Sequence, residues 1–445
     1  MSAPVVYVPI GVPTFHQESA NAAFRASLSL LRSLSGEVLA PEGPLLSPTA
    51  VGEFLEGVNE PALFVLQNTT FANAAYACEL LTRFRETPVL LWTLREPVID
   101  GGRLRLNSLT GAYSAGNAIR RFRDRPFPFV YGGPGEEATK TALRAAIRAA
   151  ELKRALTELT LAQVGHTPEG FGFGRAQDLD MLAVFGVRLV SVEVRELLDR
   201  ARSYSDAEAA EFLADAERRT VGLAGTPEAN RLGFARLYKA YETWTREYHI
   251  GALASRCWPD LFTAYGTPVC AVLGILNDLG VAASCETDAW GALSMWMGQF
   301  LTGTPVFFGD PVSLDEGENT LTFWHCGTAA CSLARPDTGA AIGEHCNRHI
   351  GPTLEFGCRP ADRATIFRVG RAPDGAFRFL IETGEILDRP KQFFGTSLVL
   401  RLDENAEELV RRTVRDGWEP HFAVIYGDVS EELSLLGDML GIPRG

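Results

Sequence analysis

Continuous apolar runs alternate with amphipathic segments over the first 150 residues, and this alternation constrains the fold most strongly. The runs 5–12, 62–70 and 88–94 (VVYVPIGV, ALFVLQNTT and PVLLWTL) have the length and composition of strands buried on both faces. Between them, residues 21–34 and 74–84 show helical periodicity. Parallel strands need such crossovers, so we expect a parallel sheet with helices on both faces.

The same pattern begins again after a long helical segment at 140–159. Strand-like runs at 159–165 and 187–194 are followed by further helices, and from about residue 305 short strands with turn residues dominate. We therefore predict an α/β chain with two Rossmann-like parallel-sheet domains and a β-rich C-terminal domain. The predicted domains are residues 1–155, 156–304 and 305–445.

Charge and composition exclude several classes of partner. The 42 basic and 55 acidic residues give a formal charge of −13, and no basic block stands out, so binding to nucleic acid or to anionic membranes is not expected. No run reaches the roughly 20 apolar residues that span a bilayer, and the first residues lack the features of a secretion signal. The eight cysteines form no CxxC pair, which favours reduced thiols and a cytoplasmic location.

A glycine-rich loop follows the strand at 159–165. Gly170, Gly172 and Gly174 have the spacing G-x-G-x-G, whereas a dinucleotide fingerprint requires G-x-G-x-x-G. A nicotinamide oxidoreductase is therefore a rival interpretation that we do not favour. We expect a flexible loop at the carboxyl edge of a sheet.

Three ionisable residues lie at the ends of successive apolar strands. Glu286 follows GVAASC, Asp310 follows PVFFG, and His325 follows NTLTFW. Such positions share one edge of an α/β sheet, where binding sites are usually found. Two carboxylates and an imidazole suit Mg²⁺ or Mn²⁺. Singly, the same residues have ordinary structural explanations (a helix cap, a turn residue and a core histidine), and periodicity alone does not decide between them.

Four motifs resemble the L-fucose isomerases. CWPD (257–260), CETD (285–288) and GDP (309–311) are similar to the central region of that family, and Asp310 follows Glu286 by the family's spacing of 24 residues. The segment 421–443 is similar to the family's closing segment, which begins with a metal-binding histidine, here His421. In the neighbouring L-arabinose isomerases a histidine in an equivalent strand binds metal, and His325 matches it. The chain is shorter than fucose isomerases, which leaves the substrate open.

The resemblance implies a metal-dependent aldose–ketose isomerase that acts on a monosaccharide through an enediolate. Glu286 and Asp310 would form the metal-binding acid/base pair, His421 would complete the coordination, and His325 would bind metal or substrate. The expected cofactor is Mn²⁺, or another divalent cation such as Mg²⁺ or Co²⁺. The family also implies a homo-oligomer, a trimer or hexamer, with sites at subunit interfaces.

Further residues are candidates for binding the sugar. Some follow strands of the first domain and others flank the proposed centre, and Arg348 could receive an anionic group on the substrate. The candidates are His16, Gln17, Asn68, Trp324 and Arg348.

Two alternatives remain from the sequence. A metal-dependent sugar epimerase or aldolase would use the same cation and the same enediolate, and its products would distinguish it. A non-catalytic sugar-binding protein would show no turnover.

Overall fold

The computed structural model describes residues 5–445 and divides into two compact units. The first comprises Met1–Ala155 and Glu431–Ile442, and the second comprises Leu156–Ser430 and Pro443–Gly445. The chain is mixed α/β with parallel sheets and a β-rich C-terminal sheet, as predicted. The predicted domain division, with a further boundary at residue 304, stays a prediction.

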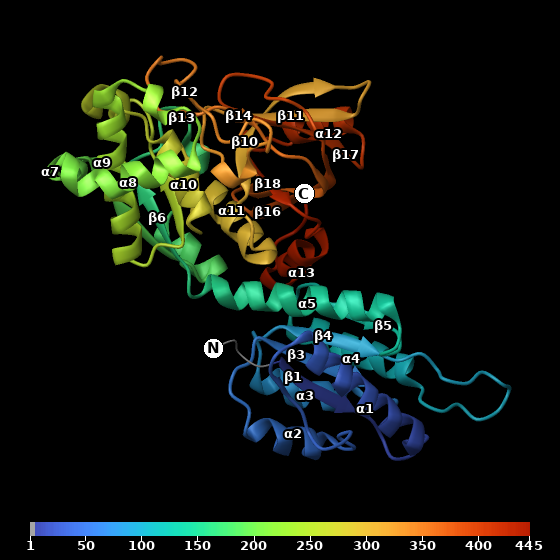
Figure 1. Cartoon of the computed structure of the whole chain (residues 1–445). Helices are drawn as coiled ribbons and strands as arrows, with labels where there is room; N and C mark the ends of the chain where they lie inside the picture. Colours follow the sequence, from blue (N-terminus) through green and yellow to red (C-terminus); the bar gives the residue numbers. More distant parts are fainter. Residues whose placement is uncertain (1–4) are drawn as a thin grey trace. The chain divides into compact units, whose positions relative to one another are not determined.

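The first unit is built on a parallel sheet with strand order β2-β1-β3-β4-β5. Alternate residues of each strand face opposite sides, so Val6 and Val8 pack against α2, α3 and α4 while Val5 and Tyr7 pack against α1 and α5. Figure 1 shows these elements in blue to blue-green. The strands are β1 (Val5–Ile10), β2 (Val38–Leu39), β3 (Leu63–Asn68), β4 (Val89–Thr93) and β5 (Phe129–Tyr131). The helices are α1 (Gln17–Leu34), α2 (Pro48–Glu56), α3 (Ala74–Arg83), α4 (Ser108–Phe122), α5 (Glu137–Leu156) and most of α13 (Ser430–Leu440).

The second unit begins with a four-stranded parallel sheet of order β7-β6-β8-β9. Its strands are β6 (Thr160–Val164), β7 (Arg188–Val192), β8 (Ala252–Ser255) and β9 (Ala282–Cys285). The helices are α6 (Asp178–Asp180), α7 (Val194–Ser203), α8 (Asp206–Arg219), α9 (Glu228–Glu247), α10 (Cys270–Asp278) and α11 (Ala289–Thr302). Helix α11 contacts β8 and β9 of this sheet and also β15 and β18 of the next one, so it lies between them.

The remaining strands form a mainly antiparallel sheet of order β11-β10-β18-β15-β16-β17-β14, and an additional pairing of β11 with β17 closes six of them into a ring. These strands are β10 (Phe307–Asp315), β11 (Thr320–His325), β14 (Phe356–Gly357), β15 (Ala361–Arg371), β16 (Phe377–Ile386), β17 (Thr396–Leu402) and β18 (Phe422–Tyr426). Closure leaves few unpaired edges. Helix α12 (Ala406–Arg415) and the short strands β12 (Ile342–Gly343) and β13 (Thr353–Leu354) complete the unit.

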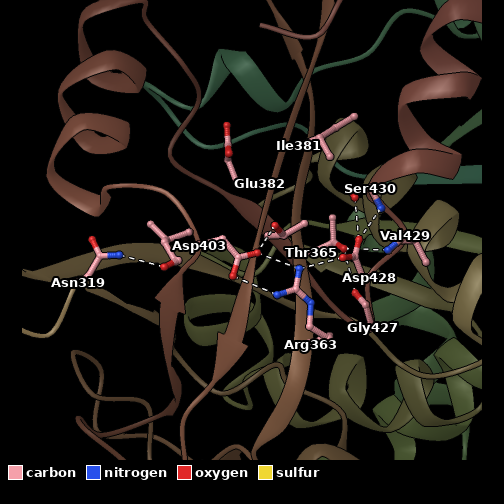
Figure 2. A network of polar contacts seen from close by, with 12 residues as sticks. Asn319, Arg363, Thr365, Ile381, Glu382, Asp403, Gly427, Asp428, Val429 and Ser430 are labelled. Carbon is pink, nitrogen blue, oxygen red and sulfur yellow. Dashed lines mark hydrogen bonds and ion pairs between the residues drawn. The ribbon is translucent and has the colours of Figure 1, made fainter.

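A polar network holds the end of β18 (Figure 2). Arg363 donates to Asp403 at 3.0 and 2.8 Å and to Asp428 at 2.9 Å, and Thr365 donates to the carbonyl of Gly427 at 2.9 Å. The backbone N–H of Val429 donates to the Thr365 hydroxyl at 3.0 Å. This network fixes the backbone at the C-terminal end of β18, whose other end carries His421.

Among residues 5–445, the structure has no helix that is both long enough and apolar enough to cross a bilayer.

Candidate active site

Glu286 lies in the short connection between β9 and α11. Its φ is +59° and that of Thr287 is +55°, in the left-handed region that residues with a Cβ rarely adopt. Such a conformation costs on the order of 1–3 kcal/mol per residue and is common at functional sites. The connection ends at Asp288, whose Oδ1 accepts the N–H of Gly291 at 2.9 Å and caps α11.

Glu286, Asp310 and His421 meet around one imidazole nitrogen. His421 precedes β18 and Asp310 lies on the neighbouring β10, where Gly309 pairs with Phe422. His421 Nε2 is 3.0 Å from Glu286 Oε2 and 3.4 Å from Asp310 Oδ1. These three residues, which are far apart in the chain and were predicted to share a centre, therefore lie close to one another.

The other nitrogen of His421 faces a buried ion pair. Nδ1 is 2.9 Å from Asp288 Oδ2, and Asp288 accepts two bonds from Arg368 of β15, at 2.6 and 3.1 Å. The Arg368 side chain is 0% exposed and that of Asp288 is 1% exposed. Burial by itself would raise the pKa of Asp288, but the Arg368 guanidinium and the His421 imidazole hold it well below its usual range.

Asp288 and Arg368 were not among the predicted site residues. The signal for Asp288 was present, because it is the second acid of the CETD motif and stands directly before an apolar helix. Nothing in the local sequence around Arg368 indicates its partner. Asp288 orients His421, and a carboxylate in this position typically fixes which nitrogen of a metal-binding histidine carries the proton.

Burial and neighbouring charges act in opposite directions on the three groups. Burial alone would lower the pKa of His421, but its bonds with Asp288 and Glu286 outweigh burial and raise the pKa to about 10. Burial alone would raise the pKa of Glu286, yet the bond with His421 and the charge of His325 lower it. Burial raises the pKa of Asp310 in spite of both histidines. The two carboxyl groups therefore have pKa values shifted in opposite directions.

His325, the last residue of β11, lies beside this centre. Its ring centroid is 5.9 Å from that of His421, and Glu286, His325 and His421 each offer a ligand atom within 4.8 Å of the other two. Nδ1 of His325 accepts the backbone N–H of Cys326 at 3.0 Å, while its buried Nε2 has no protein partner within residues 5–445. A backbone N–H only donates, so a neutral His325 would carry its proton on Nε2. Burial alone would lower the pKa of His325, but the Cys326 sulfur, 3.3 Å from Nδ1, and the two carboxylates raise it to about 9, and the charged ring also has a proton on Nε2.

The convergent atoms could hold a hard divalent cation. Ligand atoms in adjacent positions of an octahedral cation with bonds of about 2.1 Å lie about 3 Å apart. The distances from His421 Nε2 to Glu286 and Asp310 are 3.0 and 3.4 Å, while the ligand atoms that all lie within 4.8 Å of one another belong to Glu286, His325 and His421. Two carboxylates and one imidazole are a donor set suited to Mn²⁺.

Aromatic side chains surround the centre. Phe308 and Phe173 lie with their ring centroids 4.9 and 5.3 Å from that of His421. Phe171 packs against His421 and Trp258, and the Trp258 indole N–H donates to Glu286 Oε1 at 3.1 Å. These rings limit the access of water to the three polar groups.

The loop that carries Phe171 and Phe173 is the glycine-rich segment. A Cβ on Gly174 would lie 2.8 Å from the Cα of Asp288, so only glycine fits there. The sequence predicted a flexible loop at the edge of a sheet, whereas the structure packs this loop onto His421 and Asp288. The alternation of glycine with phenylalanine over residues 170–174 was the feature of the sequence that could have indicated this packing.

Arg348 and Trp324, two of the predicted sugar-binding residues, lie beside the candidate active site. The Arg348 guanidinium is 5.8 Å from the centroid of the Trp258 ring, and the exposed Arg348 makes no ion pair within the described residues. Trp324 pairs with Asp310 across β10 and β11. It also lines a cavity of about 660 Å³ together with Val312, Cys346, Asn347, Lys391, Gln392, Phe393 and Phe394.

The other predicted sugar-binding residues belong to the first unit. His16 caps α1 and contacts the Ser19 hydroxyl at 2.8 Å, and Gln17 donates to the carbonyls of Val12 and Phe15. Asn68 is fully buried at the end of β3, and neither polar atom of its side chain has a partner within residues 5–445. Their contact with a sugar stays a prediction.

Three known proteins that are similar to the chain over nearly its whole length are sulfoquinovose isomerases. The chain is 59% identical to the sulfoquinovose isomerase of Clostridium sp. (strain MSTE9), over 98% of this chain and 97% of that protein. It is 37% identical to the sulfoquinovose isomerase of Priestia megaterium (strain ATCC 12872 / QMB1551), over 98% of each, and 34% identical to that of Alkalicoccus urumqiensis, over 99% and 98%.

The other comparisons add nothing to this result. No family model matches the chain, so the resemblance to L-fucose and L-arabinose isomerases stays a prediction. Among solved structures, a periplasmic sugar-binding protein from Legionella pneumophila covers 67% of this chain and 94% of its own at 11% identity, with a TM-score of 0.17. That score is too low to support an argument.

Sequence identity of this extent over nearly the whole length of both proteins shows that the chain and these relatives belong to one family. The prediction of an aldose–ketose isomerase is therefore confirmed. The chain is an aldose–ketose isomerase and belongs to the family of the sulfoquinovose isomerases.

Proposed function

We propose that the chain interconverts sulfoquinovose and the corresponding ketose by moving a proton between C1 and C2 of the sugar through an enediolate. The names of the relatives support this substrate. The observation that carries the mechanism is the convergence of Glu286 and Asp310 on Nε2 of His421, in a site walled by aromatic rings.

In this proposal Glu286 and Asp310 form a metal-binding acid/base pair, and His421 completes a site for Mn²⁺ or a similar divalent cation. Such a cation, when bound, supplies Lewis-acid stabilisation of the negative charge that develops on the sugar oxygens. The carboxylates take the proton from one carbon and return it to the other, and help of this kind contributes roughly 10²–10⁴-fold. Asp288 holds one proton of His421 on Nδ1, so a cation would bind at Nε2 in place of the second proton, which faces Glu286.

His325 has a different role in our proposal. Because its Nδ1 accepts the Cys326 N–H, the orphaned Nε2 is a donor and is poorly suited to bind a cation. We assign it to a substrate oxygen, where its N–H stabilises the charge that develops in the enediolate.

The test of the function is conversion of sulfoquinovose, followed by chromatography and NMR of the product. We expect a ketose with the sulfonate retained, loss of conversion after chelation, and recovery on adding Mn²⁺. A product that is another aldose, or a cleaved sugar, would replace the isomerase by an epimerase or an aldolase. Undiminished conversion in the chelated, metal-free protein would remove the cation from the mechanism.

Arg348 is proposed to bind the sulfonate, since it is a cation beside the site with no carboxylate partner within residues 5–445. Hydrogen bonds to charged groups contribute about 1.5–3 kcal/mol, so Arg348→Ala is expected to lower kcat/KM for sulfoquinovose by about 10–100-fold. Quinovose, the neutral sugar without the sulfonate, should react at the same low rate with both proteins.

The matched control is Arg411→Ala, which removes an exposed arginine of α12 and should leave both rates unchanged. If Arg348→Ala slows both sugars equally, Arg348 does not recognise the sulfonate.

Trp324 is proposed to pack against the sugar from the wall of the 660 Å³ cavity. Assembly as a homo-oligomer, a trimer or hexamer in which His16, Gln17 and Asn68 contribute to sites at subunit interfaces, stays a prediction, as does the cytoplasmic location.

A further inference from the structure

A second group of metal-binding side chains lies behind His325, and its chemistry differs from that of the candidate active site. It contains the thiols of Cys257, Cys270, Cys285 and Cys326, all of them free. The sulfur atoms of Cys270 and Cys285 each lie within 4.8 Å of the Cys326 sulfur, and Cys257 neighbours Cys285. We call this group the thiol cluster.

The cluster is assembled from distant parts of the second unit. Cys270 is the first residue of α10, Cys285 is the last residue of β9, and Cys326 directly follows β11. Cys257 and Cys285 are 1% and 0% exposed, and Cys270 is 0% exposed. Four thiols gathered from separate elements are more than the occasional small core residue that buried cysteine usually represents.

An imidazole completes the cluster. The sulfur atoms of Cys270 and Cys326 and a ring nitrogen of His345 all lie within 4.8 Å of one another. The polar contact of the His345 ring is the Asn347 N–H, 3.3 Å from Nδ1, at the long end of the hydrogen-bond range. A cation would therefore displace only a weak bond. His325 also offers a ring nitrogen within 4.8 Å of the Cys285 and Cys326 sulfur atoms, but its Nδ1 already accepts the Cys326 N–H at 3.0 Å.

We propose that Cys270, Cys326 and His345 bind one thiophilic divalent cation, Zn²⁺ or Cd²⁺, at a site separate from Glu286, Asp310 and His421. Thiolate and imidazole ligands favour such ions, whereas oxygen ligands favour Mg²⁺ or Mn²⁺. With metal–sulfur bonds of about 2.3 Å, tetrahedral ligands lie nearly 4 Å apart, so a small contraction of the group suffices. The Cys285 sulfur lies within 4.8 Å of the Cys326 sulfur and is the candidate for a fourth ligand.

The neighbouring Cys326 and burial raise the pKa of the Cys270 thiol well above its usual range, so the cation has to displace the proton. The two thiol protons pass to solvent as the cation binds. Access comes through Cys326 and Cys346, which are partly exposed, and Cys346 lines the 660 Å³ cavity.

The test uses the full-length protein with Mn²⁺ in excess, titrated with Cd²⁺ while the ultraviolet absorption of the cadmium–thiolate bond is followed. We expect saturation at one equivalent of Cd²⁺. Cys270→Ser and His345→Asn should each weaken the apparent affinity for Cd²⁺ at least tenfold. Cys326→Ser should do the same, and the first two variants carry the test if it does not fold.

Two controls separate the sites. Cys358→Ser removes a buried thiol outside the cluster and should leave the titration unchanged, and Glu286→Gln should do so as well. The absence of saturable absorption in the unaltered protein would overturn the proposal. So would an equal loss of affinity in Cys358→Ser, or loss of the signal in Glu286→Gln, which would assign the Cd²⁺ to the candidate active site.

Discussion

Glu286→Gln is expected to lower kcat by at least about 10⁴-fold while leaving the fold intact. The substitution removes a carboxylate that is proposed both to move the proton and to hold the cation, and proton transfer alone accounts for roughly 10²–10⁴-fold. The amide has nearly the same shape, and its oxygen can still accept the Trp258 indole N–H. Asp310→Asn should have an effect of similar size.

Turnover and bound metal have to be measured on the same samples. We expect Glu286→Gln to lose most of its Mn²⁺, and circular dichroism should show unchanged secondary structure, with a melting transition equal to that of the unaltered protein when both are metal-free. His325→Gln is the informative comparison, because we expect it to keep Mn²⁺ at one ion per chain and yet turn over slowly. Near-normal kcat in Glu286→Gln would remove its role in proton transfer, and loss of Mn²⁺ in His325→Gln would make His325 a ligand.

Asp288→Ala is expected to cost about 3–5 kcal/mol of unfolding free energy, because it leaves the fully buried Arg368 without a counter-charge. The same change frees Nδ1 of His421 from its carboxylate, so turnover should fall as well. The loss of stability is read from denaturant unfolding and from the melting temperature of the purified protein.

The double variant Asp288→Ala/Arg368→Met provides the matched control. Replacing both members of a buried pair is often nearly neutral, so the double variant should be more stable than Asp288→Ala alone. Glu407→Ala, which breaks the exposed pair with Arg411 on α12, should cost less than about 1 kcal/mol. If Asp288→Ala costs no more than Glu407→Ala, the pair does not bear on stability.

The sequence was sufficient for the features that rest on short-range patterns. The parallel sheet of the first unit follows from apolar runs such as 62–70, separated by helical segments, because burial on both faces requires both. Glu286 and Asp310 were predicted because each follows the carboxyl end of a strand. His421 was predicted because the segment 421–443 resembles the closing segment of the fucose isomerases. The class of enzyme followed from the same motifs.

Other features were decided only when the chain folded. Arg368 meets Asp288 across 80 residues, and His421 meets Asp288 across 133, so no local pattern records either bond. The bond that Nδ1 of His325 accepts comes from one backbone N–H, and the thiol cluster depends on how the residues after β8 and β11, the end of β9 and the start of α10 are brought together. Periodicity reports which face of an element is buried, whereas partners in a buried site are selected by the packing of the whole unit.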